Sequence, residues 1–380
     1  MTSALGSPIL YEENLKYGLI LPAKRDGPTN RRRSKQDVRE DFHVQTKPLM
    51  RRLVLAAALL ALPLGGQAQE LHFFQLGTGP TGETRFPVGG LIANALSNPP
   101  GSRECDKGGS CGVPGMVAVA KSTGGSIANV EAIAQKRLDA ALVHADIAYW
   151  AYHGTGIYKG QGAVQNLRGI AMLYPETLHL VARKDAQVAS VKDLKGKRVS
   201  FGDKESGSLV HGRLLLEAYG LTEKQVKLSH LKPGASADAL AAGKLDAFLM
   251  VDAFPVPVVA DLARRADIVV VPLAGKEIDA MLGKYPFLLR QDIAEGTYQG
   301  QDKAVTSLGV GVALVTGAEQ DEKLIYGVTR ALWHPSTQKL LTQNSPSAAH
   351  IQLDAQAIEK MGIQVHGGAS AFYFDAGLVR

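Results

Sequence analysis

From residue 71 onwards, short apolar runs of strand length alternate with segments of helical period. In residues 126–135, for example, Ile127, Val130, Ile133 and Ala134 recur at the spacing of one helix face. This alternation predicts α/β architecture. The expected strands are 71–76, 116–120, 140–143, 170–173, 178–183, 198–201, 226–231, 247–251, 268–272 and 309–315, and the expected helices include 88–96 and 126–135.

Three short segments rich in Gly, Ser and Thr stand after predicted strands and just before predicted helices. They are residues 77–82, 122–126 and 206–208. In open α/β sheets the carboxyl ends of the strands form the ligand crevice, and helix N-termini offer free N–H groups and a dipole that favours anions. Three such ends in one chain predict a small acidic ligand.

Residues 50–68 have the three parts of a secretory signal: a basic start, the apolar stretch 53–64 and small residues before a cleavage site. We expect cleavage between Ala68 and Gln69 and export to the periplasm. The apolar stretch is too short to span a bilayer, which takes about 20 residues. The mature protein is therefore expected to be soluble.

A signal peptide stands near the start of translation, yet 49 residues precede Met50. We interpret Met50 as the initiator and residues 1–49 as a mis-annotated extension; a genuine long or twin-arginine leader is the alternative. The formal net charge of the whole chain is +6, but residues 1–69 hold 11 basic and 6 acidic residues. The remainder has 31 basic and 30 acidic residues, so its charge gives no reason to expect nucleic acid as a partner.

The chain has two cysteines, Cys105 and Cys111, in a Gly- and Pro-rich segment. A metal site would need further ligands nearby, and no third cysteine or histidine stands close in the sequence. With export expected, a disulfide is the better interpretation. Closing so small a loop stabilises the fold by roughly 2 kcal/mol in the entropy model.

Two motifs are typical of enzymes, but the further residues that those enzymes need are missing from the sequence pattern. Gly77-Thr78-Gly79-Pro80-Thr81-Gly82 matches the dinucleotide pattern G-x-G-x-x-G, but Lys121 stands after the next strand where an acid would bind ribose. A tight turn is the other interpretation. Ser208 and His211 lie three apart on a predicted helix, without a nucleophile elbow or an evident third member. We therefore expect no catalysis and no cofactor.

Other polar residues have ordinary structural interpretations. The ten histidines show no ligand spacing, so no metal is predicted. Ser126 could be a helix N-cap, a role compatible with ligand binding because a cap leaves other N–H groups free. Tyr174-Pro175-Glu176 is interpreted as a connection between two apolar strands, where an acid is unusual unless it meets water or a ligand.

Over residues 71–375 the chain resembles the TAXI family of solute receptors, the periplasmic components of tripartite ATP-independent (TRAP) transporters. The resemblance rests on many ordered matches, each weak by itself. They are Gly77-Thr78-Gly79 through Phe86-Pro87, Thr123-Gly124-Gly125-Ser126 with Asn129, Asp146-Ile147-Ala148-Tyr149, Gly154-Thr155-Gly156, Leu173-Tyr174-Pro175-Glu176, Leu194-Lys195-Gly196-Lys197-Arg198-Val199, Ser206-Gly207-Ser208, Lys244-Leu245-Asp246-Ala247-Phe248 and Lys284-Tyr285-Pro286-Phe287.

The resemblance implies an α/β, two-lobed periplasmic-binding-protein fold of type II, in which the chain crosses twice between lobes that close on the ligand. We place lobe one at residues 70–180 and 306–380, and lobe two at residues 181–305. The candidate crossings are 178–183 and 307–315. Receptors of this family bind glutamate-like or other small carboxylates and deliver them to a permease driven by an ion gradient.

Carried onto this chain residue by residue, the resemblance implies a cleft lined by hydroxyl groups, helix starts and two acids. A carboxylate would accept hydrogen bonds from the hydroxyls and helix-start N–H groups, and Glu176 or Asp146 could pair with an amino group. The candidate ligand-binding residues are Thr78, Gly79, Thr81, Arg85, Phe86, Gly125, Ser126, Asn129, Asp146, Tyr149, Glu176, Ser206, Gly207 and Ser208.

The chain departs from the family where it has Pro80, Glu83, Arg85 and His144, at positions where the family often has Gly, Gly, Tyr and Gln. Arg85 could clamp a carboxylate with two hydrogen bonds and favour a dianion, or it could point to solvent. Presentation of the ligand to a sensor kinase, in place of a permease, is the alternative function.

Overall fold

The computed structural model describes residues 71–379, except 355–356 and 358–360. The predicted signal peptide, its cleavage site and the extension 1–49 lie outside the described residues. Within the described part of the chain, no helix is both long enough and apolar enough to cross a membrane.

A mixed sheet runs through the described chain, with main strand order β4-β1-β5-β12-β6-β9-β7-β8. β1 is parallel to β4 and β5, and β7 is parallel to β8 and β9. The antiparallel strands β12 and β6 stand between these two parallel groups. The bounds are β1 His72–Gly77, β4 Met116–Lys121, β5 Ala140–His144, β6 Leu167–Arg183, β7 Arg198–Ser200, β8 Lys227–Ser229, β9 Ala247–Asp252, β10 Ile268–Val271, β11 Leu288–Ile293 and β12 Val305–Gly317, with β2 Ser97–Asn98 and β3 Val113–Pro114 paired separately.

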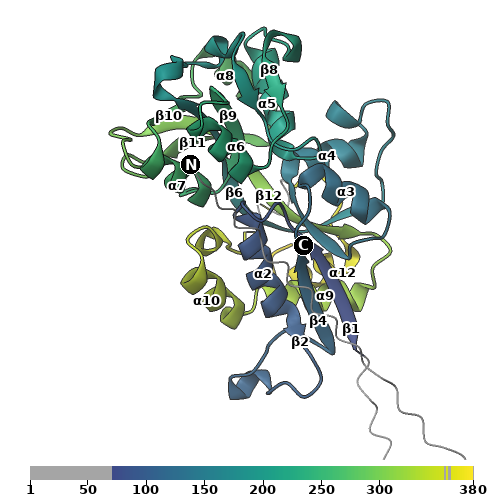
Figure 1. Cartoon of the computed structure of the whole chain (residues 1–380). Helices are drawn as coiled ribbons and strands as arrows, with labels where there is room; N and C mark the ends of the chain where they lie inside the picture. The colour runs from purple at the N-terminus through teal and green to yellow at the C-terminus, as the bar shows by residue number, and fades with distance from the viewer. Residues whose placement is uncertain (1–70, 355–356, 358–360, 380) are drawn as a thin grey trace, which may run out of the picture. The chain divides into compact units, whose positions relative to one another are not determined.

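β6 and β12 are the two long strands that join the parallel groups (Figure 1). The first half of β6 pairs with β12 beside β5, and its second half pairs with β9 and β10. The start of β12 pairs with β11, and its end pairs with β5. Two α/β parts linked by two strand segments are the arrangement of the periplasmic-binding-protein type II fold. Both predicted crossings fall within β6 and β12, whereas the residue limits of the lobes remain a prediction.

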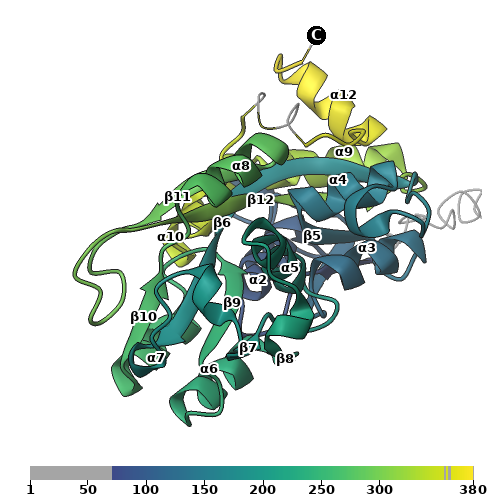
Figure 2. The same cartoon turned by 90° about the horizontal axis from the view of Figure 1, so that it is seen from above.

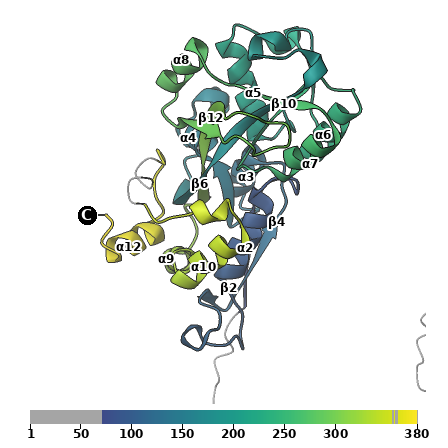
Figure 3. The same cartoon turned by 90° about the vertical axis from the view of Figure 1, so that its left-hand side faces the viewer.

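Helices cover both faces of the sheet. Figure 2 shows α8 on one side of β6 and β12 and α6 and α7 on the other, and Figure 3 shows α2, α9 and α10 close together in lobe one. The bounds are α2 Arg85–Leu96, α3 Ser126–Ala134, α4 Ala145–His153, α5 Gly207–Ala218, α6 Pro233–Ala241, α7 Pro257–Arg265, α8 Lys276–Lys284, α9 Glu322–Leu332, α10 Pro335–Asn344 and α12 Gly367–Asp375.

The buried apolar side chains form separate cores. One core fills lobe one and includes Leu76, Leu142 and Val315. In lobe two, successive residues of β9 contribute to opposite faces: Phe248 packs with α6 and α7, and Leu249 packs with α5 and α8. Because both faces are covered, β5 and β9 are buried at every position, which explains their continuous apolar runs.

The predicted strands are found, with one correction. The runs 170–173 and 178–183 are parts of the single strand β6, so Tyr174-Pro175-Glu176 is not a connection. The pairing of β6 with β12 shifts register between Tyr174 and Met172. A proline is tolerated in a strand beside such a bulge, where the ladder of hydrogen bonds is already interrupted. The sequence pattern also gave no signal for β11, in which Arg290 and Asp292 are exposed and Gln291 is half-buried.

Two helix starts differ from the prediction. α2 begins at Arg85, three residues before the expected Val88. Gly125 is the N-cap of α3, so Ser126 is the first helical residue and not the cap. Gly125 has a φ of 120°, a conformation that side chains other than glycine's rarely adopt. The Ser126 hydroxyl is therefore left for other partners.

The predicted disulfide between Cys105 and Cys111 is confirmed, with Cα atoms 4.7 Å apart. It closes the loop between β2 and β3, at the far end of lobe one from the strand ends described below. The disulfide therefore belongs to the scaffold of lobe one.

The core of lobe one predicts a large loss of stability for Leu142→Ala. Leu142 is fully buried in β5, and removing its side chain should lower the free energy of unfolding by about 2–5 kcal/mol. The control is Leu289→Ala in β11, a side chain 37 % exposed, for which we expect at most about 1 kcal/mol. Urea unfolding followed by circular dichroism measures both, and equal losses would contradict the assignment of Leu142 to the core.

Candidate ligand site at the strand ends

The candidate site lies where the carboxyl ends of both parallel groups of strands meet. Thr78 follows β1 and Asp146 follows β5 in lobe one. Asp252 ends β9, and Ser206 stands between β7 and α5 in lobe two. Chain segments leaving parallel strands at the same edge bring polar residues together there. Residues far apart in sequence therefore share one site.

The site is a cluster of polar side chains that are almost completely removed from solvent. Such groups must find partners, because an unpaired buried charge is strongly unfavourable. We call this set the buried polar cluster: Thr78, Glu83, Thr84, Arg85, Ser126, Asn129, His144, Asp146, Glu176, Ser206, Ser208, His211 and Asp252, each at most 8 % exposed.

Arg85 is fully buried at the start of α2 and contacts three side chains. Its Nη2 donates to Glu83 Oε2 at 2.5 Å, and its Nη1 donates to Ser126 Oγ at 3.0 Å. Its Nε lies 3.4 Å from Glu176 Oε1. Burial opposes the charged form, but these carboxylates, Glu176 first, raise the pKa of Arg85 overall. Arg85 is therefore a charged group held inside the protein, and of the two predicted orientations the one toward solvent is excluded.

Glu176 connects Arg85 to His144. His144 Nε2 lies 2.7 Å from Glu176 Oε2, and the His144 backbone N–H donates to Ser126 Oγ at 3.1 Å. Burial, followed by the nearby Arg85 charge, holds the pKa of His144 well below its ordinary value. His144 is therefore neutral, and it donates its Nε2 proton to Glu176 when that carboxyl is ionised.

Polar contacts of two acids join lobe one to lobe two. Asp146 Oδ2 lies 3.0 Å from His211 Nε2 on α5. The backbone N–H of Thr84 donates to both carboxylate oxygens of Asp252, at 3.1 and 3.0 Å. Burial raises the pKa of Asp146, but the His211 charge and contact outweigh it and lower the pKa overall. Asp146 is therefore ionised in this arrangement.

The N-terminus of α3 is also occupied by lobe two. The Ile127 backbone N–H donates to the carbonyl oxygen of Glu205 at 3.2 Å. Ser206, the N-cap of α5, accepts from Leu209 N–H, and its Cα lies 3.2 Å from the position a Cβ would take on Gly125. The starts of α3 and α5 thus meet directly, and glycine at 125 allows the close approach.

The carboxylates of the buried polar cluster outnumber its one guanidinium. Burial raises the pKa of Glu83 from 4.5 to about 7 although Arg85 opposes this, and burial likewise raises the pKa of Glu176 to about 7. Burial, together with the Glu176 and Glu83 charges, raises the pKa of Asp252 well above its ordinary value. The site therefore favours a proton or another positive charge.

Most of the predicted ligand residues come together here, and three lie apart. Thr78, Arg85, Ser126, Asn129, Asp146, Glu176, Ser206 and Ser208 all belong to the buried polar cluster. Thr81 is exposed, Phe86 is half-buried, and Tyr149 is 36 % exposed and packs against His153 and Phe287. Asn129 donates to the carbonyl oxygens of Thr78 and Leu142, so its amide group positions backbone.

Five members of the cluster are not among the ligand residues predicted from the sequence: Glu83, Thr84, His144, His211 and Asp252. The sequence does give a signal for Asp252, because this acid ends a continuous apolar strand. Asp146 follows such a strand, and Glu176 interrupts one. The sequence suggests a role for His211 only as the partner of the possible nucleophile Ser208. Its pairing with Asp146 joins two lobes, and no local spacing predicts such a contact.

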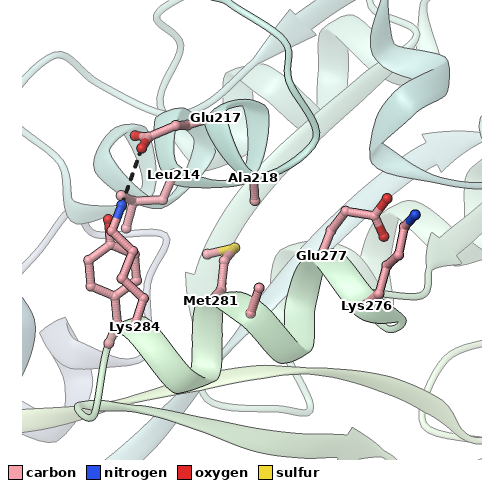
Figure 4. Close-up of a pocket in the computed structure, with 9 residues that line it drawn as sticks. Leu214, Glu217, Ala218, Lys276, Glu277, Met281 and Lys284 are labelled. Carbon is pink, nitrogen blue, oxygen red and sulfur yellow. Dashed lines mark hydrogen bonds and ion pairs between the residues drawn. The ribbon is translucent and has the colours of Figure 1, made fainter.

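A cavity of about 10 Å³ adjoins the cluster and is lined in part by Glu83, Ser206 and Ser208. This is about the space of one water molecule. A solute of several atoms does not fit this cavity in the arrangement described. The groove between α5 and α8 is larger, about 360 Å³, but it is lined by residues such as Glu217, Met281 and Lys284 and by none of the predicted ligand residues (Figure 4).

The fold is that of the α/β periplasmic-binding-protein type II class. A family model described as the NMT1-like family matches residues 76–377, and the chain belongs to this family.

Solved structures of binding proteins are also similar to the chain. The alkanesulfonate-binding protein SsuA from Xanthomonas axonopodis pv. citri is 15 % identical, with a TM-score of 0.41 over 82 % of this chain and 96 % of that one. PhnD1 from Prochlorococcus marinus, solved with methylphosphonate, is 12 % identical, with a TM-score of 0.44 over 81 % of this chain and 99 % of that one. Likenesses at this level decide nothing about the ligand of this chain.

The raised pKa values of Glu83 and Glu176 predict that stability falls as pH rises. Both carboxyls bind protons more tightly in the folded protein than in the unfolded chain, so the free energy of unfolding decreases between about pH 4.5 and pH 7. Glu83→Gln should reduce this decrease by on the order of 1–3 kcal/mol. Urea unfolding at pH 5 and pH 8 measures it.

The matched control for that measurement is Glu205→Gln, which changes an exposed glutamate close to the site. It should leave the pH dependence unchanged. A Glu83→Gln protein that loses as much stability as the wild type between the two pH values would show that Glu83 is not the titrating group.

Proposed function

We propose that this protein is a periplasmic receptor that captures a small carboxylate, most specifically a glutamate-like amino acid, and delivers it to the permease of a TRAP-type secondary transporter. A dicarboxylate is the competing ligand class. The observation that carries the proposal is the meeting of the α3 and α5 N-termini beside the buried Arg85.

The carboxylate part of the proposal rests on donors that already hold oxygen atoms. Ile127 N–H at the start of α3 donates to the Glu205 carbonyl oxygen, and Arg85 Nη1 donates to Ser126 Oγ. If the lobes separate, a carboxylate can replace the Glu205 oxygen at the helix N-terminus, where the dipole favours a negative charge. Arg85 lies one side chain away, on the other side of Ser126.

The amino-acid part rests on the excess of acids. Glu83 and Glu176 share Arg85, and Asp252 accepts hydrogen bonds from the backbone N–H groups of Thr84 and Ala253. A second negative charge on the ligand would add to this excess, whereas an ammonium group would compensate it. A ligand with one positive group therefore complements the cluster better than a plain dianion does.

A thermal-shift screen with matched ligands tests the two parts separately. Glutamate and glutarate carry the same two carboxylates and differ in the amino group. We expect glutamate to raise the melting temperature strongly, since a ligand at about 100 times its dissociation constant adds about 2.7 kcal/mol, and glutarate to raise it much less. Equal shifts would favour the dicarboxylate class, and no shift after unfolding and refolding to remove bound solute would contradict the carboxylate proposal.

Variants of Arg85 test its role in that binding. Arg85→Gln should weaken binding of the stabilising ligand at least about tenfold, because charged hydrogen bonds contribute about 1.5–3 kcal/mol. Arg213→Gln on α5, an arginine whose side chain is 49 % exposed, should leave the affinity unchanged. Ser126→Ala supplies a second variant if Arg85→Gln does not fold, and full affinity in both would remove this region from the ligand site.

The second candidate is a ligand-sensing protein for a sensor kinase, which uses the same closure of two lobes. Ligand stabilises the closed form by its differential affinity, and either partner can recognise that form. Uptake into proteoliposomes that hold a TRAP-type permease separates the two. Uptake that needs this protein and an ion gradient, without ATP, supports the receptor; ligand-dependent kinase activity without uptake supports the sensor.

A further inference from the structure

Three ligand-type side chains from different elements converge inside the buried polar cluster. His144 ends β5, Asp146 lies in the first turn of α4, and His211 lies on α5 of lobe two. One nitrogen or oxygen of each lies within 4.8 Å of those of the other two, and all three side chains are fully buried. In Figure 1, α4 and α5 belong to the two parts of the chain that β6 and β12 join.

Each imidazole has one nitrogen held by a hydrogen-bond acceptor outside this group of three. His144 Nε2 lies 2.7 Å from Glu176 Oε2, and His211 Nδ1 lies 2.8 Å from the carbonyl oxygen of Gly207. The Gly207 carbonyl requires a proton on His211 Nδ1, and the ionised form of Glu176 requires one on His144 Nε2. The remaining nitrogens, His144 Nδ1 and His211 Nε2, then carry lone pairs in the neutral rings.

Both lone pairs face surroundings in which a cation would be stabilised. His211 Nε2 lies 3.0 Å from Asp146 Oδ2 without the geometry of a regular hydrogen bond, so in the neutral ring two acceptors face each other. His144 Nδ1 faces the start of α5 at Gly207 and has no hydrogen-bond partner among the described residues. Either a proton on His211 or a metal ion resolves the first contact, but only an ion shared by all three also uses His144 Nδ1.

The outer contacts match those of metal-binding histidines. A ligating histidine usually donates its other ring N–H to a carboxylate or a backbone carbonyl, which fixes the tautomer and the ring orientation. Glu176 and Gly207 supply one of each. The carboxyl groups of Glu83 and Asp252 lie in the same buried polar cluster, in which acids outnumber the one guanidinium of Arg85.

We propose that His144, Asp146 and His211 bind a divalent first-row transition-metal ion, with Zn²⁺ as the reference ion, which joins lobe one to lobe two. Two imidazoles and a carboxylate suit Zn²⁺, Ni²⁺ or Cu²⁺ and not Ca²⁺ or Mg²⁺, which prefer oxygen ligands only. Three protein ligands leave a fourth position of tetrahedral Zn²⁺ for water or for a solute group. The metal proposal does not depend on the proposed carboxylate ligand, because the ion is expected to bind in the absence of that ligand.

The local spacing of histidines and acids in the sequence does not predict this metal site. The two histidines lie on different lobes, and the aspartate is two residues from one of them. A second group of possible ligands, Cys105, Cys111 and His334, is excluded as a thiolate site because the two cysteines form the disulfide. That group supplies a natural control.

The test is isothermal titration of ZnCl₂ into untagged protein freed of metal by a chelator. We expect one ion per chain, an affinity at least tenfold weaker in His211→Gln and in Asp146→Asn, and no change in His334→Gln. Affinity should rise with pH, because protein ligands bind a metal ion in their deprotonated forms. Co²⁺ should give the visible absorption of a four-coordinate ion in the wild type and lose it in His211→Gln, a readout that a purely structural role would not change.

Three outcomes would overturn the proposal. They are the absence of Zn²⁺ binding to the refolded wild type, binding that persists unchanged in both site variants, and binding that is lost in His334→Gln. In the first case, a protonated His211 paired with Asp146 is the remaining explanation of their contact. Far-ultraviolet circular dichroism of each variant shows whether it folds, and with two site variants one misfolded protein does not leave the site undecided. Failure of the glutamate screen with Zn²⁺ bound would count against the carboxylate proposal only.

Discussion

The structure around the site depends on keeping a charged arginine inside the protein. Arg85 has no access to solvent, and it stays charged because Glu83, Glu176 and Ser126 surround its guanidinium. Removing one partner of such a group leaves a buried charge uncompensated, which is far more costly than losing a surface ion pair. The positions of α2, β6 and the start of α3 are therefore coupled through one side chain.

If the lobes open and close, the same constraint links their closure to charge. Burial raises the pKa of Glu83 and Glu176 to about 7, so the closed arrangement holds carboxyl groups that bind protons near neutral pH. Separation of the lobes would return these groups to water and to their ordinary pKa values. A bound cation, whether a proton, an ammonium group or a metal ion, thus favours closure by differential affinity for the closed form.

The link between charge and lobe closure can act through β6 and β12, the two strands that the lobes share. β6 carries Glu176 near its middle, and β12 pairs with β6 on both sides of that residue. Rotation of one lobe relative to the other must bend these strands, and the register shift beside Tyr174 is a local weakness in the pairing. The acid that contacts Arg85 and His144 therefore stands next to the place where the two lobes are joined.

Much of this arrangement was readable from local sequence. Apolar runs such as 140–143 and 247–251 predicted buried strands because a sheet covered on both faces needs continuous apolar residues. The Gly- and Ser-rich segments before α2, α3 and α5 predicted a polar edge, and Ser126, Glu176 and Ser206 do lie in one buried cluster. The disulfide followed from two cysteines close together in an expected exported chain.

Other features were decided by tertiary structure. The merging of 170–173 and 178–183 into β6 depends on the pairing of both runs with β12, and a proline between them hides that continuity. Arg85 is buried because Glu83 and Glu176 reach it, and His211 meets Asp146 because α5 of lobe two faces α4 of lobe one. Sequence patterns report which residues are apolar and which can cap a helix. They do not report which distant polar groups a fold brings within 3 or 4 Å, and this proximity decides the charge and the chemistry of the site.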